Sequence, residues 1–342
     1  MTPMERMVAS LSHKEGDRVP FFLTLTMHGA RELDMSIEEY FSKPEYVAEG
    51  QLKLQKKYNN DALYGFYYAA IEVEPWNGKV IYSNDGPPNA GEPVIKSASD
   101  IKKLTVPVIE ESARLSDVLI TIRLLKENVS LNIPIFCVVM SPFSLPVMQM
   151  GFDKYLDLIY NEPELFKTLM QVNEKYCVDW ANAQLDAGAT AVVYFDPVSS
   201  LTIIPKELYL KTGFEIAKRV IPQIKGPVAC HFASGRCFNI LNEILSLGFA
   251  AIAPGIDDNL REVKNRCRGK ATILGGINAI KMRNWTTKQT ESEVKKLIKE
   301  LGSGGGIILT DFHGEIPLQV PDNVLLAFSD AMHQFGNYPI EE

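Results

Sequence analysis

The feature that most constrains the fold of this chain is an alternation of short apolar runs with longer helical patterns along its 342 residues. The runs are rich in β-branched and aromatic residues and apolar on both faces, which is typical of parallel strands covered by helices. Eight runs are predicted as strands, at residues 19–26, 61–69, 134–140, 189–195, 227–231, 250–253, 271–274 and 306–310. Helical patterns between them include residues 163–185, 205–220, 237–247 and 287–301. Eight alternations favour an α/β fold of the (β/α)8 TIM barrel type, with a doubly wound open sheet as the alternative.

Two of the predicted strands end in polar residues that include histidine. The fifth strand ends in His231, and the eighth is followed by Asp311, His313 and Glu315. The carboxyl ends of the strands build the active site of an α/β barrel, so we expect these side chains on one functional face. The pattern predicts an enzyme, and its imidazole and carboxylate groups are also metal-ligand types.

A single domain is predicted for residues 1–342, because barrels of this class run long as one unit. Residues 78–106 break the alternation: extended runs at 79–83 and 93–96 flank a turn-rich stretch and predict an inserted hairpin. Either this hairpin overhangs the barrel mouth or it is an excursion without a role. The glycine-rich residues 302–306 precede a strand, whereas phosphate loops follow one, so we interpret them as a turn.

Charge and cysteine usage narrow the partners and the compartment. A net charge of −7 argues against nucleic acid as the main ligand. The five cysteines are scattered without a Cys-x-x-Cys pair, which favours a reducing cytoplasm. The first 18 residues are charged, and no run approaches the roughly 20 apolar residues of a membrane span. We therefore expect a soluble cytoplasmic protein with no membrane partner, and the sequence leaves its oligomeric state open.

Several short segments, in order along the chain, carry a resemblance to a known family. They lie at residues 17–20 (Asp-Arg-Val-Pro), 92–94, 100–104, 141–145 (Ser-Pro-Phe-Ser-Leu), 150–152, 186–189, 195–200 (Phe-Asp-Pro-Val-Ser-Ser), 227–235 and 274–277 (Leu-Gly-Gly-Ile). Together they resemble the uroporphyrinogen decarboxylase superfamily. The resemblance implies a (β/α)8 barrel, in agreement with the count of strands.

The superfamily has two main branches. Its decarboxylases remove carboxylates from a tetrapyrrole without a cofactor, and its cobalamin-dependent methyltransferases move a methyl group between a small substrate and a corrinoid protein. The decarboxylases carry an arginine-rich loop after the first strand and an aspartate late in the second. Here residues 26–31 contain one arginine, Arg31, and Tyr68 stands at the aspartate position. Acetate side chains need cationic partners, so the methyltransferase branch is the closer resemblance.

The zinc site of the methyltransferase branch is changed in this chain. That branch has His-x-Cys after the fifth strand and a second cysteine after the eighth. His231 matches the histidine, but Ala233 replaces the first cysteine, and His313 or Gly314 replaces the second. Two alternatives remain: no metal, or zinc held by nitrogen and oxygen ligands. The latter set would be His231, His313, Asp311 and Glu315.

An oxygen- and nitrogen-ligated zinc would activate a substrate at oxygen. The expected reaction is therefore demethylation of a small O-methylated compound, such as a phenyl methyl ether, with transfer to the cob(I)alamin of a separate corrinoid protein. The chain itself shows no cobalamin-binding domain.

The resemblance also suggests catalytic groups. Glu72 and Glu74 resemble an acidic segment of the methyltransferases. They lie two residues apart, so in an extended segment both side chains would face the same way. Asp196 belongs to a similar Asp-Pro turn. Expected substrate contacts are His28, Tyr68, Tyr194 and Phe195. Two other functions stay open: a decarboxylase acting alone, and a non-catalytic barrel that binds a tetrapyrrole or a partner protein.

Overall fold

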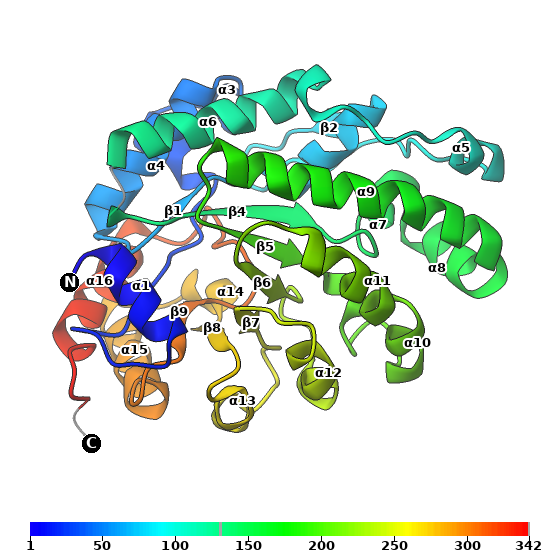
Figure 1. Cartoon of the computed structure of the whole chain (residues 1–342). Coiled ribbons are helices and arrows are strands. Elements are labelled where there is room, and N and C mark those ends of the chain that lie inside the picture. Colours follow the sequence, from blue (N-terminus) through cyan, green and yellow to red (C-terminus); the bar gives the residue numbers. More distant parts are fainter. Residues whose placement is uncertain (130–131, 341–342) are drawn as a thin grey trace.

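Seven parallel strands form one sheet that curls into a barrel (Figure 1). The structure, a computed structural model, describes residues 1–129 and 132–340. The strands lie side by side in the order β1 (Leu63–Tyr64), β4 (Ile135–Met140), β5 (Ala191–Phe195), β6 (Val228–His231), β7 (Ala251–Ala253), β8 (Thr272–Ile277) and β9 (Ile307–Asp311). The predicted α/β barrel architecture is confirmed, although β1 is much shorter than its predicted range of 61–69.

The predicted strand at residues 19–26 is wrong as a regular strand, since only Phe21 forms a β-bridge, with Leu309 of β9. Leu309 donates its N–H to the carbonyl of Pro20 over 3.0 Å, while Pro20 has no N–H to return. On the other side, a side chain replaces a main-chain partner: Asp61 Oδ2 accepts the N–H of Phe21 over 2.9 Å. The segment therefore closes the ring between β9 and β1 without a regular ladder.

Helices surround the barrel on its outside (Figure 1). The α-helices are α1 (Pro3–Leu11), α2 (His28–Glu32), α3 (Ile37–Tyr40), α4 (Pro44–Tyr58), α5 (Ala98–Lys103), α6 (Ala113–Val129), α7 (Pro146–Met150), α8 (Phe152–Asn161), α9 (Pro163–Ala187), α10 (Lys206–Lys211), α11 (Gly213–Val220), α12 (Leu241–Leu245), α13 (Leu260–Cys267), α14 (Ala279–Met282), α15 (Thr287–Leu301) and α16 (Asp322–Phe335). The 3-10 helices are η1 (Ala69–Trp76), η2 (Ile109–Glu111), η4 (Pro197–Ser199), η5 (Ile221–Gln223) and η6 (Phe238–Ile240). Across residues 1–129 and 132–340, no helix is both long enough and apolar enough to cross a membrane.

The helix at 287–301 is confirmed with its predicted bounds, and that at 163–185 extends to Ala187. The predicted helix at 205–220 is interrupted at Thr212, whose ψ of −91° is not helical. The break follows from close packing, because a Cβ on Gly213 would lie 2.0 Å from Ser199 Oγ. The stretch at 237–247 contains only the short η6 and α12.

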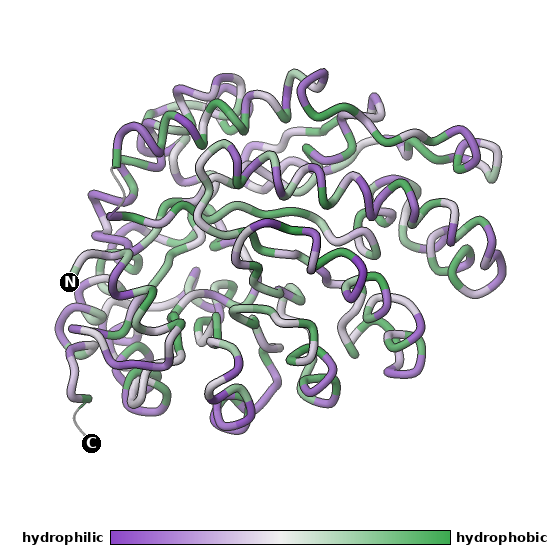
Figure 2. The backbone as a smooth tube through the Cα atoms, viewed as in Figure 1, coloured by the Kyte–Doolittle hydropathy of each residue, from purple (hydrophilic) through white to green (hydrophobic). Residues whose placement is uncertain are grey.

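Two apolar cores lie on opposite faces of the sheet. The larger fills the layer between the strands and the helices, and the smaller fills the inside of the barrel, with Phe22, Tyr64, Val138 and Ile308 among its members. Figure 2 shows hydrophobic residues along the central strands and hydrophilic residues on the outer turns of the helices. Alternate residues of each strand therefore belong to different environments.

The predicted hairpin is present, but one of its arms was wrongly placed. β2 (Val80–Ile81) pairs antiparallel with β3 (Asn89–Ala90) rather than with residues 93–96. The pairing occurs earlier because Gly91 donates its N–H to Lys79, directly after β3. The side chain of Gln319, in the loop after β9, bonds to the Asp85 carbonyl at the hairpin tip. The hairpin therefore reaches over the carboxyl-terminal face of the barrel.

Candidate functional site

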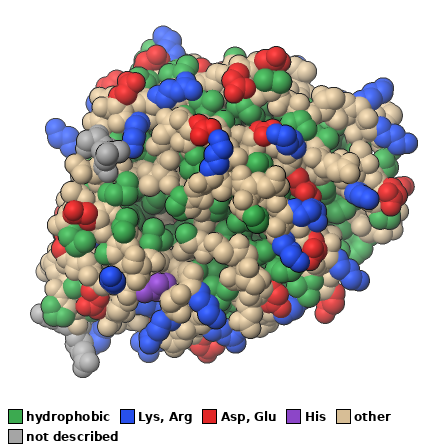
Figure 3. All heavy atoms as spheres, in the orientation of Figure 1, with side chains coloured by type: hydrophobic (Ala, Val, Ile, Leu, Met, Phe, Trp, Pro, Cys, Tyr) green, Lys and Arg blue, Asp and Glu red, His purple; other side chains and the backbone are tan. Residues whose placement is uncertain are grey.

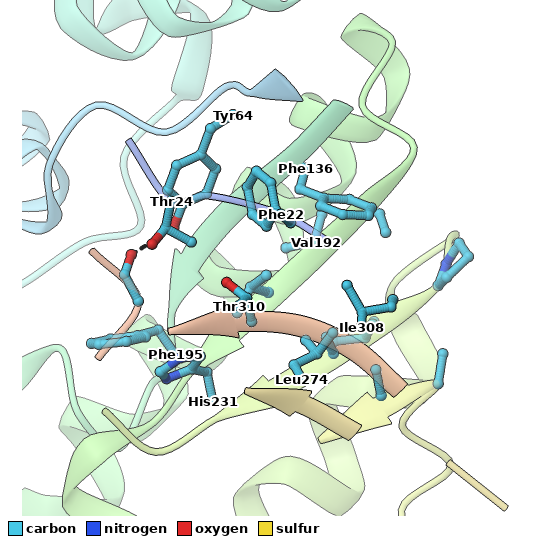
Figure 4. A pocket seen from close by; sticks show the side chains of 18 of the residues that line it. Phe22, Thr24, Tyr64, Phe136, Val192, Phe195, His231, Leu274, Ile308 and Thr310 are labelled. Atoms are coloured by element: carbon cyan, nitrogen blue, oxygen red, sulfur yellow. Dashed lines mark hydrogen bonds between the residues drawn. The ribbon is translucent and has the colours of Figure 1, made fainter. Parts of the chain in front are cut away.

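The carboxyl ends of β6 and β9 converge at one end of a cavity inside the barrel. The cavity has a volume of about 70 Å³, and its lining is almost entirely apolar. His231 and Gly314 both line it, and a Cβ on Gly314 would lie 3.5 Å from the imidazole Cε1. Figure 4 shows Phe22 and Phe136 on one side, with His231, Leu274 and Ile308 opposite. The expected meeting of the two strand ends is thus observed.

His231 is held in one orientation by its neighbours. The backbone N–H of Ala233 donates to His231 Nδ1 over 2.9 Å, and the Phe195 ring stacks on the imidazole at 5.2 Å between centroids. Burial, and then the nearby His313, lower the pKa of His231 to about 3, so the ring is neutral at pH 7. Because Nδ1 accepts, the proton of the neutral ring lies on Nε2. That atom is buried and has no hydrogen-bond partner among the described residues, so its N–H is an unpaired donor there.

The turn after His231 carries backbone strain. Ala233 and Ser234 both have positive φ, 49° and 68°, a region that non-glycine residues rarely occupy. Strain of this kind persists where the surrounding structure imposes it, often beside functional groups. Here it brings the Ala233 N–H under the imidazole.

The end of β9 and the segment after it carry acidic side chains that are held by hydrogen bonds. Asp311 Oδ1 accepts the N–H groups of His313 and Gly314 over 2.6 and 2.8 Å. Thr24 donates to the other oxygen of Asp311, and Thr26 donates to Glu315. Neither threonine was predicted from the sequence, although their spacing of two on an extended segment indicates that both side chains face the same way.

Burial controls the ionisation of this segment. It raises the pKa of Asp311, against the hydrogen bonds of Thr24 and the His313 N–H. It raises the pKa of Glu315 to about 7, with a bond from Thr26 acting against it and the Asp311 charge acting with it. Burial lowers the pKa of His313, against the opposite pull of Asp311. Glu315 is therefore the carboxyl group best placed to exchange a proton near neutral pH.

These residues do not fit the zinc site expected from sequence. No group of three or more His, Cys, Asp or Glu side chains within the described part of the chain is arranged to hold a metal. A zinc ligand must present a lone pair, but His231 presents Nε2–H while its lone pair accepts from Ala233. Asp311 Oδ1 already accepts two backbone N–H groups. We therefore derive no step through a metal.

The expected substrate contacts divide between the two faces of the sheet. Phe195 lines the cavity, whereas its neighbour Tyr194 faces outward and packs 6.0 Å from the Phe249 ring. Tyr68 is also outside, with its hydroxyl bonded to Glu74 and Tyr82. Alternation along β5 explains why adjacent residues cannot both face the cavity.

His28 is fully buried at the start of α2, away from the cavity lining. Both of its ring nitrogens are without a hydrogen-bond partner among the described residues. Burial lowers its pKa to about 3, assisted by Arg31. It is a neutral core histidine at pH 7.

The expected pair of glutamates is separated, because η1 is a 3-10 helix rather than an extended segment. Glu72 is buried between the sheet and the helices, where it accepts the Met140 N–H over 2.9 Å and burial raises its pKa well above the ordinary value. Glu74 lies 3.8 Å from Arg114 near the surface. The prediction that both face one way is wrong, and neither lines the cavity.

Asp196 braces two loops. It accepts hydrogen bonds from Ser141 and Ser144 over 2.6 and 2.7 Å, and its N–H donates to the His231 carbonyl over 2.8 Å. Burial raises its pKa, although the serine hydroxyls act in the opposite direction. Its position supports the end of β6 rather than the cavity itself.

Comparison with known proteins gives the family. Residues 2–335 match the uroporphyrinogen decarboxylase (URO-D) model, so the chain belongs to that family. Curated relatives include the uroporphyrinogen decarboxylase of Methylococcus capsulatus, 24% identical over 98% of this chain and 95% of that protein. That of Pseudoalteromonas translucida is 23% identical over 85% and 84%.

Among solved structures, a methyltransferase from Methanosarcina mazei superposes with a TM-score of 0.88. It is 18% identical, with 98% of this chain and 99% of that one covered. A B12-independent methionine synthase from Shewanella has a TM-score of 0.56 at 13% identity, covering 87% and 89%. These likenesses establish the fold.

Proposed function

We propose that this protein is a methyltransferase that takes a methyl group from a small O-methylated compound and passes it to the cob(I)alamin of a separate corrinoid protein. The observation that carries the proposal is the pairing of an apolar cavity with a single buried imidazole donor at its end, His231 Nε2–H. An apolar wall suits a methyl group, and the donor suits the oxygen to which that methyl is attached.

The same site is poorly suited to a tetrapyrrole rich in carboxylates. No Lys or Arg lines the cavity within the described residues. Arg31, the one arginine of α2, donates to Asp322 and to the carbonyls of Leu318 and Val320. Electrostatics thus favour a neutral substrate over uroporphyrinogen, despite the names of the curated relatives.

The chain's own residues supply orientation, hydrogen bonding and a proton. When the C–O bond breaks, the oxygen keeps the electron pair and gains negative charge, which the His231 Nε2–H is positioned to stabilise. Removing one such donor in other enzymes lowers the rate by about 10²–10³-fold. Glu315 does not line the cavity, so a proton from this group, whose pKa is about 7, reaches the leaving alcohol through solvent. The corrinoid supplies the nucleophile that receives the methyl group.

The experiment mixes the purified protein with reduced corrinoid and small methoxy compounds, and follows loss of the cob(I)alamin absorbance. The proposal expects loss that requires both the protein and an O-methyl donor. A parallel incubation with uroporphyrinogen measures carboxylate loss without corrinoid. Decarboxylation there, together with no methyl transfer from any donor, would refute the proposal in favour of the relatives' activity.

A further inference from the structure

The inside of this barrel is unusually empty at one side. TIM-barrel interiors are normally filled by layers of bulky branched side chains. Here the inward positions of β5, β6 and β7 near their amino ends are alanines, Ala191, Ala229 and Ala251, all of which line the cavity. The aromatic rings of Phe22 and Phe136 on the opposite side do not reach across to fill the space (Figure 4).

The cavity runs along the barrel from its amino-terminal end to His231. Leu11, the last residue of α1, and Pro227, just before β6, line the amino-terminal part. Pro227 is exposed and Leu11 is half-buried, so this part approaches the surface. Figure 3 shows hydrophobic side chains gathered around a hollow in the face turned to the viewer.

The carboxyl-terminal part of the cavity contains two polar atoms that lack partners. His231 and Thr310 both line it, and His231 Nε2 and Thr310 Oγ1 are each buried without a hydrogen bond to any described residue. Burying a polar group without a hydrogen bond is unfavourable, and these two, unlike the unpartnered nitrogens of His28, belong to residues that line a cavity able to hold a partner. One atom is a donor, and the hydroxyl can donate or accept.

The volume limits the size of that ligand. A water occupies about 30 Å³ of liquid, and an engineered cavity of roughly 150 Å³ holds benzene. A cavity of about 70 Å³ therefore admits a group of few heavy atoms but not an aromatic ring. The phenyl methyl ether expected from sequence is too large to enter it whole.

We infer that the barrel axis binds a small aliphatic oxygen compound, an alcohol or methyl ether of about three or four heavy atoms. The alkyl carbon atoms lie against Ala229, Ala251 and Ile308, the oxygen accepts from His231 Nε2 beside Thr310, and the methyl group of an ether points toward the carboxyl ends of the strands, where a corrinoid protein reaches it. As a statement about the methyl donor, this inference rests on the proposed function. As a statement about binding, it stands without it.

The test measures binding by ligand-observed NMR, with ethanol, methyl ethyl ether and anisole as probes on the full-length protein. Ala229→Leu fills the cavity and should abolish binding of the two aliphatic probes, as should Ala251→Val if the first variant fails to fold. Cys230→Ala is the matched control, because Cys230 lies on the same strand in the outer core. Thr310→Val should weaken binding of methyl ethyl ether about 5–10-fold, the loss of one hydrogen bond, while leaving xenon uptake unchanged.

Anisole binding that Ala229→Leu leaves intact, or aliphatic binding indifferent to both filling variants, would overturn the inference. Binding of the aliphatic probes without methyl transfer to any corrinoid would refute the proposed function and leave the binding site standing.

Discussion

Asp61 is expected to be the most sensitive charged residue for stability, because it holds the segment that closes the barrel. Its carboxylate, 1% exposed, accepts Arg6 Nη1 over 2.6 Å and Arg18 over 2.7 and 2.9 Å. It also accepts the N–H of Phe21 over 2.9 Å. The Asp61→Asn variant removes the charge that two buried guanidinium groups share, and turns an amide NH₂ toward their donors. Breaking a buried pair in this way destabilises proteins by about 3–5 kcal/mol.

The assay is urea unfolding followed by tryptophan fluorescence, compared where refolding restores the signal. Asp186→Asn is the control, since Asp186 pairs with Lys225 at 3.1 Å and both side chains are more than 60% exposed. Exposed pairs contribute about 0–1 kcal/mol, so the control should lose no more than that. Equal losses of unfolding free energy in the two variants, or a loss below 1 kcal/mol for Asp61→Asn, would refute the argument that the buried Asp61 carboxylate stabilises the segment that closes the barrel.

Three further changes follow from the site. Because the pKa of Glu315 is raised to about 7, its contribution to stability is full below about pH 4.5 and is lost as pH rises through about 7, a change of about 3 kcal/mol. Glu315→Gln should flatten this part of the pH dependence of the unfolding free energy. An unchanged slope in that variant would contradict the assignment. Ala233→Gly relieves a positive φ and should leave the free energy of unfolding equal or raise it by up to about 1 kcal/mol, whereas Ala183→Gly within α9 should lower it by about 1 kcal/mol in the same urea titration. Ser144→Ala removes bonds to Asp196 and to the Val198 N–H and should destabilise by about 1–3 kcal/mol; a neutral effect would mean that Asp196 does not brace the loops.

Most of the barrel could be predicted from the sequence, because buried parallel strands are short, continuous and β-branched. The closing segment could not. Its irregularity depends on Pro20 and on the Asp61 side chain, which lies 40 residues further along the chain and replaces a main-chain acceptor for Phe21. Local sequence patterns do not show that a distant side chain accepts a hydrogen bond that a neighbouring strand would otherwise accept. The second arm of the hairpin was placed wrongly for a similar reason, since the register of two paired strands depends on their contacts rather than on the propensity of each residue.

The site was predictable at the strand ends and less so around them. His231 and the residues after β9 were located by the rule that polar groups follow barrel strands. Tyr194 and Phe195 are adjacent on β5, so only one of them can face the cavity. Both faces of the sheet are covered by apolar residues, so the sequence does not show which of the two it is. The prediction that Glu72 and Glu74 face the same way assumed an extended segment, but these residues lie in the 3-10 helix η1. The tautomer of His231 is set by a local turn in which Ala233 and Ser234 adopt positive φ, a conformation that residue types other than glycine do not predict.

The central claim is that the His231 Nε2–H, without a metal ligand role, assists methyl transfer from oxygen. The most direct test is the single-turnover rate of methyl transfer from a small methyl ether to cob(I)alamin, for chelator-treated wild-type protein and for His231→Phe. The phenyl ring keeps the stacking on Phe195 but cannot donate. We predict an unchanged rate after chelation and a fall of about 10²–10³-fold in the variant. A wild-type rate in His231→Phe, or a rate lost on chelation and restored by zinc, would contradict the account.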